Sequence, residues 1–483
     1  MAEQGKLTKR VASGVAWSIA EKVGSALLQA VVSIVVANRI MPMDMGIMAV
    51  LTVFITLAQL VVDSGFSQTL IRKAAPTQGD YLAVFRFNII SSIALYLLLT
   101  AISPYVAHYY EWPLLTRVAP ILFLSLPLNA LGVIQNTMMV REMRFAQLST
   151  MTFFATLISG ALAIGMAVAG MGIWALVGQR LAMMASKSAM LWWQNGWRPR
   201  KVQTRGALRE MAPFSLRLMT TDIITSIYNN ISQLFIGKMY SGSTLGCFSQ
   251  AQKLVNMPYT LLLSIQSVTF PALARIKDEE EKFAESYRLV AMATCLIMFP
   301  IMAGLIATTE DFYHLLLKAD WYPAIPYFQI LCVGGFFYPL SYISYNILKV
   351  KSDGSIVLRL EIVKRAIMTV ILILTIPHSV KAVAWGLSLS IACEMALNTF
   401  SALRYVRISI WRLMRTLLPI ALLTLAMYVG VMYVGDFASK WSVAARLTIK
   451  IVAGVVIYAA GGLAFRMESF KQSIALLKQL ISR

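Results

Sequence analysis

Apolar runs of about twenty residues recur along the whole of this 483-residue chain. A membrane-spanning helix needs about 20 mostly apolar residues, and the sequence contains fourteen such runs, at 13–37, 46–63, 82–104, 115–137, 149–169, 172–193, 213–237, 246–269, 287–307, 324–346, 360–376, 380–400, 416–434 and 443–465. Hydrophobic residues make up 58% of the chain and charged residues only 13%, which excludes a disordered chain and an ordinary soluble domain. We therefore expect an all-α polytopic membrane protein with 14 transmembrane helices.

The basic residues indicate how the chain is oriented in the membrane. The formal net charge is +21, from 43 Lys and Arg against 22 Asp and Glu. With a cytoplasmic N-terminus, 29 of the basic residues fall in cytoplasmic segments and 7 in external ones. Cytoplasmic loops carry the excess of Lys and Arg in multi-pass proteins, so both termini are predicted to be cytoplasmic. This topology accounts for the positive charge, and no nucleic-acid partner is expected.

The first six runs and the next six resemble each other at an offset near 200 residues. Segment 37–46 aligns with 237–246, and each ends in Gly. Chance similarity among hydrophobic helices is the alternative interpretation. A true repeat of six spans predicts two pseudo-symmetric lobes with a substrate site at their interface. The predicted divisions are a six-helix lobe at 1–200, a second six-helix lobe at 201–403, two additional C-terminal helices at 404–465 and a cytoplasmic amphipathic tail at 466–483.

Polar residues recur at helical spacing in the first and seventh runs. They are Lys22, Ser25, Gln29 and Ser33, and then Asp222, Thr225, Asn229 and Gln233. Gaps of three and four residues place each set on one side of a helix. Helix packing explains single Ser and Thr residues, but a charge at mid-membrane costs about 2.5–3.5 kcal/mol and needs a partner or water. The second and eighth runs show similar polar faces, so a cleft between the two lobes is predicted.

The predicted substrate-binding residues are basic and amide side chains on or near these faces. Cations in a low-dielectric cleft attract a diphosphate group. The set comprises Lys22, Arg217, Lys253, Gln29, Asn229, Gln233, Asn256, Arg86 and Asn88. The acids Glu21, Asp63 and Asp222 would hold these cations or carry a coupling ion, H⁺ or Na⁺. For Lys22, Arg217 and Arg86, snorkelling to the membrane surface or structural pairing is the alternative.

Motifs of catalysis and nucleotide binding are missing from the sequence. It contains no HExxH, GxSxG or Walker-type GxxxxGK[ST] pattern. Its four cysteines lie in apolar runs without CxxC spacing, which predicts neither a disulfide framework nor a zinc site. We expect a protein that is not an enzyme and has no cofactor or metal. Transport would then be secondary, with H⁺ or Na⁺ as the open choice of coupling ion.

Residues near the N-terminus resemble those of lipid-linked oligosaccharide flippases. Trp17, Glu21, the stretch VVSIVVANRIMPMDMGIMAVLTVFITLAQLVVDSGFSQTLIRK and the pair Phe87-Asn88 are similar to the polysaccharide transporter family of the MOP exporter superfamily, in its lipopolysaccharide or colanic-acid exporter type. The resemblance implies a bacterial inner-membrane protein that flips an undecaprenyl-diphosphate-linked oligosaccharide repeat unit from the cytoplasmic to the periplasmic leaflet by alternating access. The implied product is a surface polysaccharide such as O-antigen, capsule or exopolysaccharide. The implied partners are the lipid-linked oligosaccharide, membrane lipid, a polysaccharide polymerase and glycosyltransferases.

Two other functions stay open at this point. A cation-coupled small-molecule or drug antiporter of the same superfamily would have an acidic and compact cavity. A membrane-embedded glycan polymerase would carry a large periplasmic loop with Arg or His, and none of the predicted loops is long enough for that.

Overall fold

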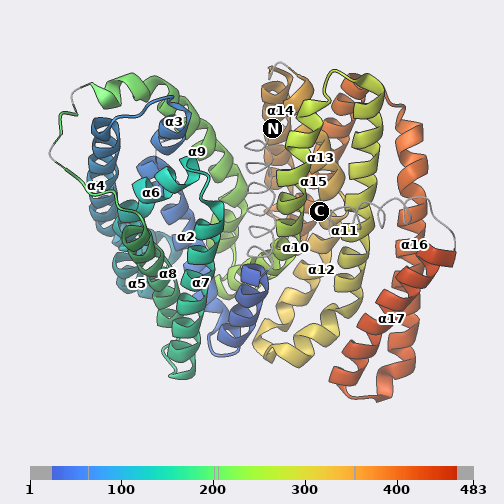
Figure 1. Cartoon of the computed structure of the whole chain (residues 1–483). Coiled ribbons are helices and arrows are strands. Elements are labelled where there is room, and N and C mark those ends of the chain that lie inside the picture. The colour runs from blue at the N-terminus through green and yellow to red at the C-terminus, as the bar shows by residue number, and fades with distance from the viewer. Residues whose placement is uncertain (1–23, 64, 201, 205, 353–354, 465–483) are drawn as a thin grey trace. The chain divides into compact units, whose positions relative to one another are not determined.

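The computed structural model describes residues 24–63, 65–200, 202–204, 206–352 and 355–464. Every regular element in these ranges is an α-helix or a short 3-10 helix. The chain divides into two compact units, Met1–Ser249 and Gln250–Arg483, and each is considered by itself (Figure 1). The predicted lobes and C-terminal helices follow the sequence repeat, whereas the two units follow contacts in space. The boundaries at residues 200 and 403 therefore stay a prediction.

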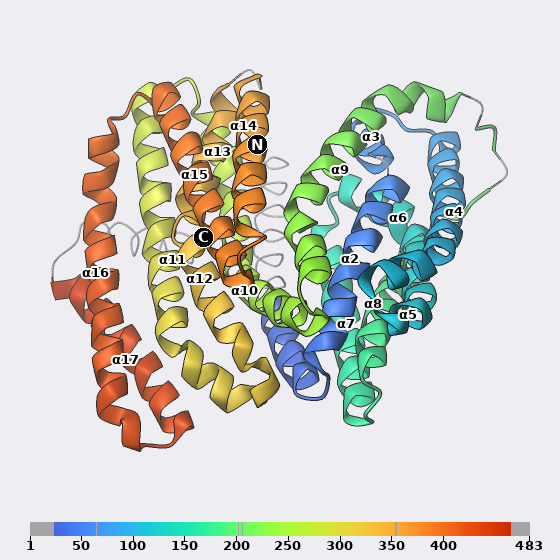
Figure 2. The ribbon, with the colours of Figure 1, turned by 180° about the vertical axis from the view of Figure 1, so that it is seen from behind.

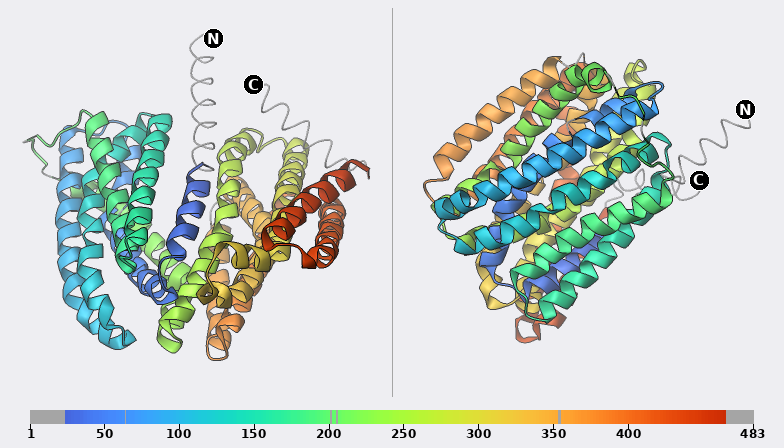
Figure 3. Two further views of the ribbon diagram at one scale, coloured as in Figure 1. Left: turned by 90° about the horizontal axis from the view of Figure 1, so that it is seen from below. Right: turned by 90° about the vertical axis from the view of Figure 1, so that its left-hand side faces the viewer.

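The first unit is a bundle of long helices that run side by side (Figure 3). Helix α4 packs on α5 and α6, α8 packs on α6 and α7, and α2 packs on α9. The elements are the helix Gly24–Ala37, α2 (Pro42–Asp63), α3 (Phe66–Arg72), α4 (Gln78–Tyr110), α5 (Pro113–Phe123), α6 (Ser125–Arg141), α7 (Phe145–Val168), α8 (Ile173–Gln194), α9 (Ala207–Met239) and the start of α10 (Gly242–Arg275).

The second unit continues α10 and ends in a hairpin of two helices, α16 and α17 (Figure 2). Its main core joins α11, α13, α15 and α16 around residues such as Tyr287, Cys295 and Leu413. Its elements are α11 (Glu280–Leu316), the 3-10 helix η1 (Ala319–Ala324), α12 (Ile325–Gly335), α13 (Tyr338–Lys351), α14 (Ser355–Thr375), α15 (Val380–Val406), α16 (Ile410–Phe437), the 3-10 helix η2 (Ala438–Lys440) and α17 (Val443–Ala464).

Polar caps and glycines set where these apolar helices begin and end. Helix α4 begins with a capping box, in which the Thr77 side chain accepts from the Asp80 amide and the Asp80 carboxylate accepts from the Thr77 amide. The turn between α7 and α8 places Gly170 and Gly172 at positive φ, 76° and 56°, where side chains are disfavoured. The capping box thus fixes the start of α4, and the two glycines separate the long apolar segment 145–194 into α7 and α8.

The fourteen predicted runs all coincide with helical segments, although the first is described only from Gly24 onward. Within the described ranges, eight helices are long and apolar enough to cross a membrane, and the bent pair α12–α13 makes a ninth. Helices α8, α9, α10 and α14 are not among these eight. The multi-pass, all-helical fold is thus confirmed, whereas the count of fourteen spans stays a prediction.

Two of the predicted spans consist of two helical elements each, which their continuous apolar runs did not indicate, although Pro113–Arg141 still counts as one candidate span. Run 115–137 consists of α5 and α6, which meet at Leu124. Run 324–346 consists of α12 and α13, which are bent by 41°. Proline accompanies both breaks, with Pro120 inside α5 and Pro339 in the first turn of α13, and proline removes a helix hydrogen bond.

A matching pair of contacts, one in each unit, supports the internal repeat. Ser188 Oγ donates at 2.6 Å to the carbonyl oxygen four residues before Gly132, and a Cβ added to that glycine would lie 2.8 Å from the same Oγ. Ser388 Oγ donates at 2.8 Å to the carbonyl oxygen four residues before Gly334, where the added Cβ would lie 2.9 Å away. The serines are 200 residues apart and the glycines 202, which agrees with the predicted offset.

Candidate functional site

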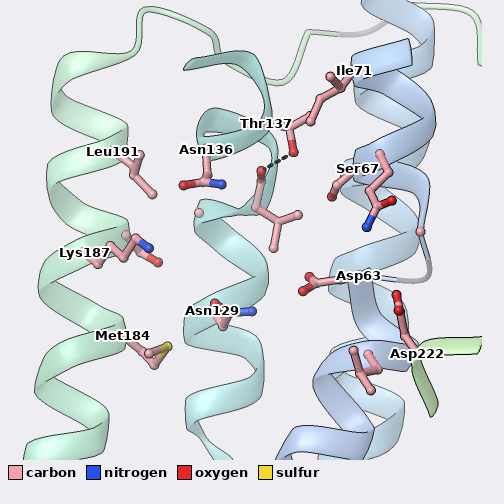
Figure 4. A pocket seen from close by; sticks show the side chains of 16 residues that line it. Asp63, Ser67, Ile71, Asn129, Asn136, Thr137, Met184, Lys187, Leu191 and Asp222 are labelled. Carbon is pink, nitrogen blue, oxygen red and sulfur yellow. Dashed lines mark hydrogen bonds between the residues drawn. The ribbon is translucent and has the colours of Figure 1, made fainter. Parts of the chain in front are cut away.

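A pocket of about 370 Å³ lies inside the first unit, between α2, α3, α6, α8 and α9 (Figure 4). Three charged side chains line it, namely Asp63, Lys187 and Asp222. The uncharged polar side chains of the lining are Ser67, Gln68, Asn129, Asn136, Thr137 and Ser188. A polar pocket within apolar, membrane-type helices is where transport sites are built.

A break between α2 and α3 forms one wall of the pocket. Asp63 is the last residue of α2, and α3 begins at Phe66 after Gly65, whose φ is 66°. A Cβ on Gly65 would lie 2.7 Å from the carbonyl oxygen of Ser215 on α9, so the close approach of α9 requires glycine. The break aims Asp63 and Ser67 into the same space (Figure 4), and interrupted helices are typical of transporter binding sites.

Side-chain contacts fix the short helix α3 on α9. Thr69 Oγ1 and Ser215 Oγ are hydrogen-bonded at 2.7 Å, and the Arg72 guanidinium lies 4.7 Å from the centre of the Phe214 ring. Just beyond α3, Lys73 donates to Glu210 at 3.0 Å, which raises the pKa of Lys73 above its ordinary value. The wall that carries Asp63 and Ser67 is therefore held at three successive points.

Helices α6 and α8 form the facing wall. Asn129 and Asn136 stand seven residues apart, so they share one face of α6, and Gly132 between them allows Ser188 of α8 to approach closely. Thr137 Oγ1 donates to the carbonyl oxygen of Val133 at 2.8 Å (Figure 4). Asn129 and Asn136 were missed by the sequence analysis, although two amides at a spacing of seven within one apolar run are a usable signal.

The charges of the pocket favour a cation or a proton. Asp63 Oδ1 is buried and accepts no hydrogen bond from the described residues, and the nearby positive charge that acts on it is Lys187. Burial of a carboxylate is costly without such a partner. Two carboxylates and one ammonium leave an excess of one negative charge when all are ionised, so this pocket opposes a diphosphate.

The structure brings together only part of the predicted site. Asp63 and Asp222 line the same pocket, as a shared role would require. The other predicted residues of the first unit lie away from this lining: Arg217 and Asn229 are exposed on α9, Gln233 is half-buried there, Gln29 is exposed on the helix 24–37, and Arg86 is exposed on α4.

The remaining predicted residues lie in three different settings. Asn88 is fully buried, and with its amide nitrogen turned toward α2 it donates to the carbonyl oxygens of Val62 at 2.8 Å and Val84 at 3.2 Å, which is the geometry of a packing residue. Lys253 and Asn256 lie on α10 in the second unit. Glu21 and Lys22 fall outside the described residues. The cationic cleft between lobes therefore stays a prediction.

A multivalent metal ion is typically held by a cluster of acidic, histidine or cysteine side chains. Within the described residues, no three His, Cys, Asp or Glu side chains come together as such a site would require. The acidic pair Asp63 and Asp222, with Lys187 beside it, is instead an arrangement that a monovalent cation or a proton can neutralise.

Comparisons with known proteins agree with this architecture. A family model described as "Polysaccharide biosynthesis protein" matches residues 35–326. The teichuronic acid biosynthesis protein TuaB of Bacillus subtilis is 24% identical over 68% of this chain and 69% of its own length. The succinoglycan biosynthesis transport protein ExoT of Rhizobium meliloti is 23% identical over 67% and 66%. The lipopolysaccharide biosynthesis protein WzxC of Escherichia coli is 24% identical over 68% of each chain.

Solved structures show the fold. The lipid II flippase MurJ in an inward closed conformation superposes with a TM-score of 0.72 at 14% identity, covering 92% of this chain and 97% of that one. An inward-facing multidrug resistance MATE transporter of the MOP superfamily gives a TM-score of 0.63 at 15% identity, covering 81% and 96%. The family match spans more than half of the sequence, so this membrane protein with a MurJ- and MATE-like fold belongs to the polysaccharide biosynthesis protein family.

Proposed function

We propose that the protein flips an undecaprenyl-diphosphate-linked oligosaccharide repeat unit from the cytoplasmic to the periplasmic leaflet of a bacterial inner membrane. The product would be used for a surface polysaccharide, and the protein itself would catalyse no covalent step. The observation that carries the proposal is the match of residues 35–326 to the polysaccharide biosynthesis protein family. The pocket with three charged side chains in the first unit supports it as a place where a coupling cation could bind. Ionisable residues within membrane proteins are rare and commonly mark substrate or ion pathways.

Several finer features belong to the same proposal. The chain would cross the membrane fourteen times with both termini in the cytoplasm, and the substrate would pass between the lobes by alternating access. The relatives ExoT and WzxC are named for succinoglycan transport and lipopolysaccharide biosynthesis, which supports a lipid-linked saccharide as cargo. A polymerase and glycosyltransferases would act on the same intermediate after and before this step.

Asp63 is the proposed coupling residue. It combines an unpartnered buried oxygen with a neighbouring lysine. Binding of one H⁺ or Na⁺ would therefore change the net charge of the pocket from one negative charge to zero. A switch of this kind at a helix break can bias two arrangements of the bundle. Asp222 on α9 would share the bound cation.

The test uses the purified full-length protein in liposomes that contain an undecaprenyl-diphosphate-linked disaccharide. Without flipping, a membrane-impermeant galactose oxidase reaches only the outer half of the substrate, and an active flippase makes nearly all of it accessible. A fluorescent phosphatidylethanolamine in parallel vesicles controls for general lipid scrambling. Ethidium uptake without saccharide movement would support the second candidate, a cation-coupled drug antiporter, which the acidic pocket and the MATE-like fold favour.

Coupling is tested in the same vesicles with an imposed pH or Na⁺ gradient. Wild-type flipping should accelerate with one of the two gradients, and Asp63→Asn should flip at a rate independent of both. The conservative change Asp63→Glu should retain the response in part. A gradient response that survives Asp63→Asn unchanged would remove Asp63 from the coupling role without affecting the flippase assignment.

A further inference from the structure

Helix α13 in the second unit has one open face, and that face consists of aromatic and cationic side chains. From Tyr338 to Lys349 only Tyr338, Tyr342, Tyr345 and Lys349 keep part of their surface exposed, while all the residues between them are buried. The gaps of four, three and four residues place the four side chains in one line along the helix. These four residues form the tyrosine stripe.

The stripe differs from the faces that meet lipid. Beyond Arg359, the exposed residues of α14 are all aliphatic, and Ile362 and Ile373 are each more than 60% exposed. A lipid-facing surface needs no hydroxyl or ammonium groups, and these groups are costly in hydrocarbon. The stripe carries three phenol hydroxyls, of which that of Tyr345 is hydrogen-bonded to Glu361, and one ammonium group. Such groups suit a ligand that offers hydrogen bonds and negative charge.

Two aromatic rings of the stripe stack in nearly parallel planes. The rings of Tyr338 and Tyr342 are nearly parallel, with centroids 5.7 Å apart and an interplanar angle of 17°. Tyr259 of α10 stacks on Tyr338 at 4.2 Å and 14°. A phenol ring has an apolar body and a polar tip, and a sugar ring likewise has a C–H face and a rim of hydroxyls. Because these rings stack on one another, a sugar unit would pack along their exposed edges and hydroxyl tips and not between their faces.

Positive charge gathers at one end of the stripe. Two ammonium groups lie close to the Tyr345 ring, that of Lys349 at 4.3 Å and that of Lys364 of α14 at 4.5 Å from its centroid. Lys364 and Arg365 both pair with Glu361, at 2.5 Å and 3.4 Å.

The acids facing this end do not cancel its charge. Glu361 lies on α14 and Glu394 on α15, and Lys364 and Arg365 act electrostatically on Glu394. Three cations, Lys349, Lys364 and Arg365, therefore face two carboxylates, which leaves one positive charge in excess. Lys349 is the exposed member of the group, and an ammonium in this position attracts a phosphate as a point charge.

We propose that the tyrosine stripe of α13 is a saccharide-diphosphate subsite, in which Tyr338 and Tyr342 pack against sugar rings while Lys349, with Lys364 and Arg365 behind it, holds the diphosphate. The proposal rests on the proposed function, because it supplies the headgroup site that the acidic pocket of the first unit cannot provide. The cationic end contains Lys349, Lys364 and Arg365, which the predicted topology places at the cytoplasmic side, where a lipid-linked substrate would be loaded.

The experiment measures binding of three soluble probes to the purified full-length protein in detergent. The probes are a farnesyl-diphosphate-linked disaccharide, farnesyl diphosphate alone and the free disaccharide. Tyr342→Leu and Tyr338→Leu should weaken binding of the linked disaccharide about tenfold and leave farnesyl diphosphate binding unchanged. Lys349→Gln should weaken both diphosphate probes, because a charge-assisted contact is lost.

Two kinds of variant separate recognition from folding. Tyr342→Phe keeps the ring, so it should bind the linked disaccharide within about threefold of wild type. Tyr433→Leu changes an equally aromatic residue of α16 that is 77% exposed, and it should bind all probes normally. Equal loss in Tyr342→Phe and Tyr342→Leu, or unchanged binding in all stripe variants, would overturn the subsite. The vesicle assay tests the proposed function separately. If the wild-type protein flips the saccharide and the stripe variants bind the probes normally, only the subsite is rejected. If the wild-type protein does not flip the saccharide, the proposed function is rejected.

Discussion

Gly46 of α2 lies directly against the backbone of Gly242 of α10, so closely that a Cβ at residue 46 would stand 2.0 Å from the carbonyl oxygen of residue 242. The relationship is reciprocal, because a Cβ at Gly246 would stand 1.7 Å from the carbonyl oxygen of Pro42. Two segments that are equivalent in the repeat thus cross with each glycine facing the start of the other helix. Backbones can approach this closely in membrane proteins only where side chains are absent.

Gly46→Ala and Gly246→Ala are expected to destabilise the first unit, each by about 1–3 kcal/mol, because the added methyl group meets backbone atoms that cannot move aside. The measurement is the apparent Tm of the detergent-solubilised protein. Gly165→Ala in α7 is the matched control, since nothing lies within 4 Å of its added Cβ and alanine favours the helix. A Tm for Gly46→Ala as high as that of Gly165→Ala would contradict the crossing.

The sequence could predict the elements of this arrangement but not their contacts. Segments 37–46 and 237–246 align with glycine at the same place, yet only the fold shows that the two glycines serve one crossing. Asp63 and Asp222 were predicted because charges stand out in apolar runs. Asn129 and Asn136 were missed because they lie in the fourth run, whereas the polar faces used for the prediction were those of the first, second, seventh and eighth runs. The tyrosine stripe was missed because hydropathy counts aromatic residues as membrane anchors or core.

The paired serines of the two units should have equal effects on stability. Ser188→Ala and Ser388→Ala each remove one interhelical hydrogen bond, and such bonds in membrane proteins contribute about 0.6 kcal/mol on average. We expect small and similar decreases in Tm. Ser186→Ala is the control, because that hydroxyl bonds within its own helix, to Ala182 at 2.6 Å. A large effect at one serine and none at the other would argue against structural equivalence.

Asp63 and Lys187 should behave as an energetically coupled pair. Lys187→Met alone leaves the Asp63 carboxylate in the pocket without its neighbouring cation. Asp63→Asn alone removes a negative charge that offsets the Lys187 ammonium. The double variant removes both charges, so it should be more stable than the sum of the single effects predicts, by about 0.5–3 kcal/mol. Tm values of the four proteins give the coupling. Strict additivity would show that Lys187 does not neutralise Asp63.

A buried ion cluster should anchor the last helix, α17, to α11. Asp311 is 1% exposed and pairs with Arg446 at 2.5 Å and with Lys450 at 2.7 Å. Lys450 also donates to the carbonyl oxygen of Ala307 at 3.2 Å. Asp311→Asn would leave two cations with no carboxylate in an apolar contact, which typically costs about 3–5 kcal/mol. We expect a large fall in Tm or a loss of folded protein in this variant.

The milder change Lys450→Met keeps the experiment informative if Asp311→Asn does not fold. It retains the Arg446 pair and replaces the buried amine by an apolar side chain of similar length, so its Tm should stay well above that of Asp311→Asn. Glu280→Gln is the surface control, because its partner Arg407 is 74% exposed and such pairs contribute about 0–1 kcal/mol. If Asp311→Asn were as stable as Glu280→Gln, the anchoring of α17 would have to come from its apolar packing against α11 and α16 instead.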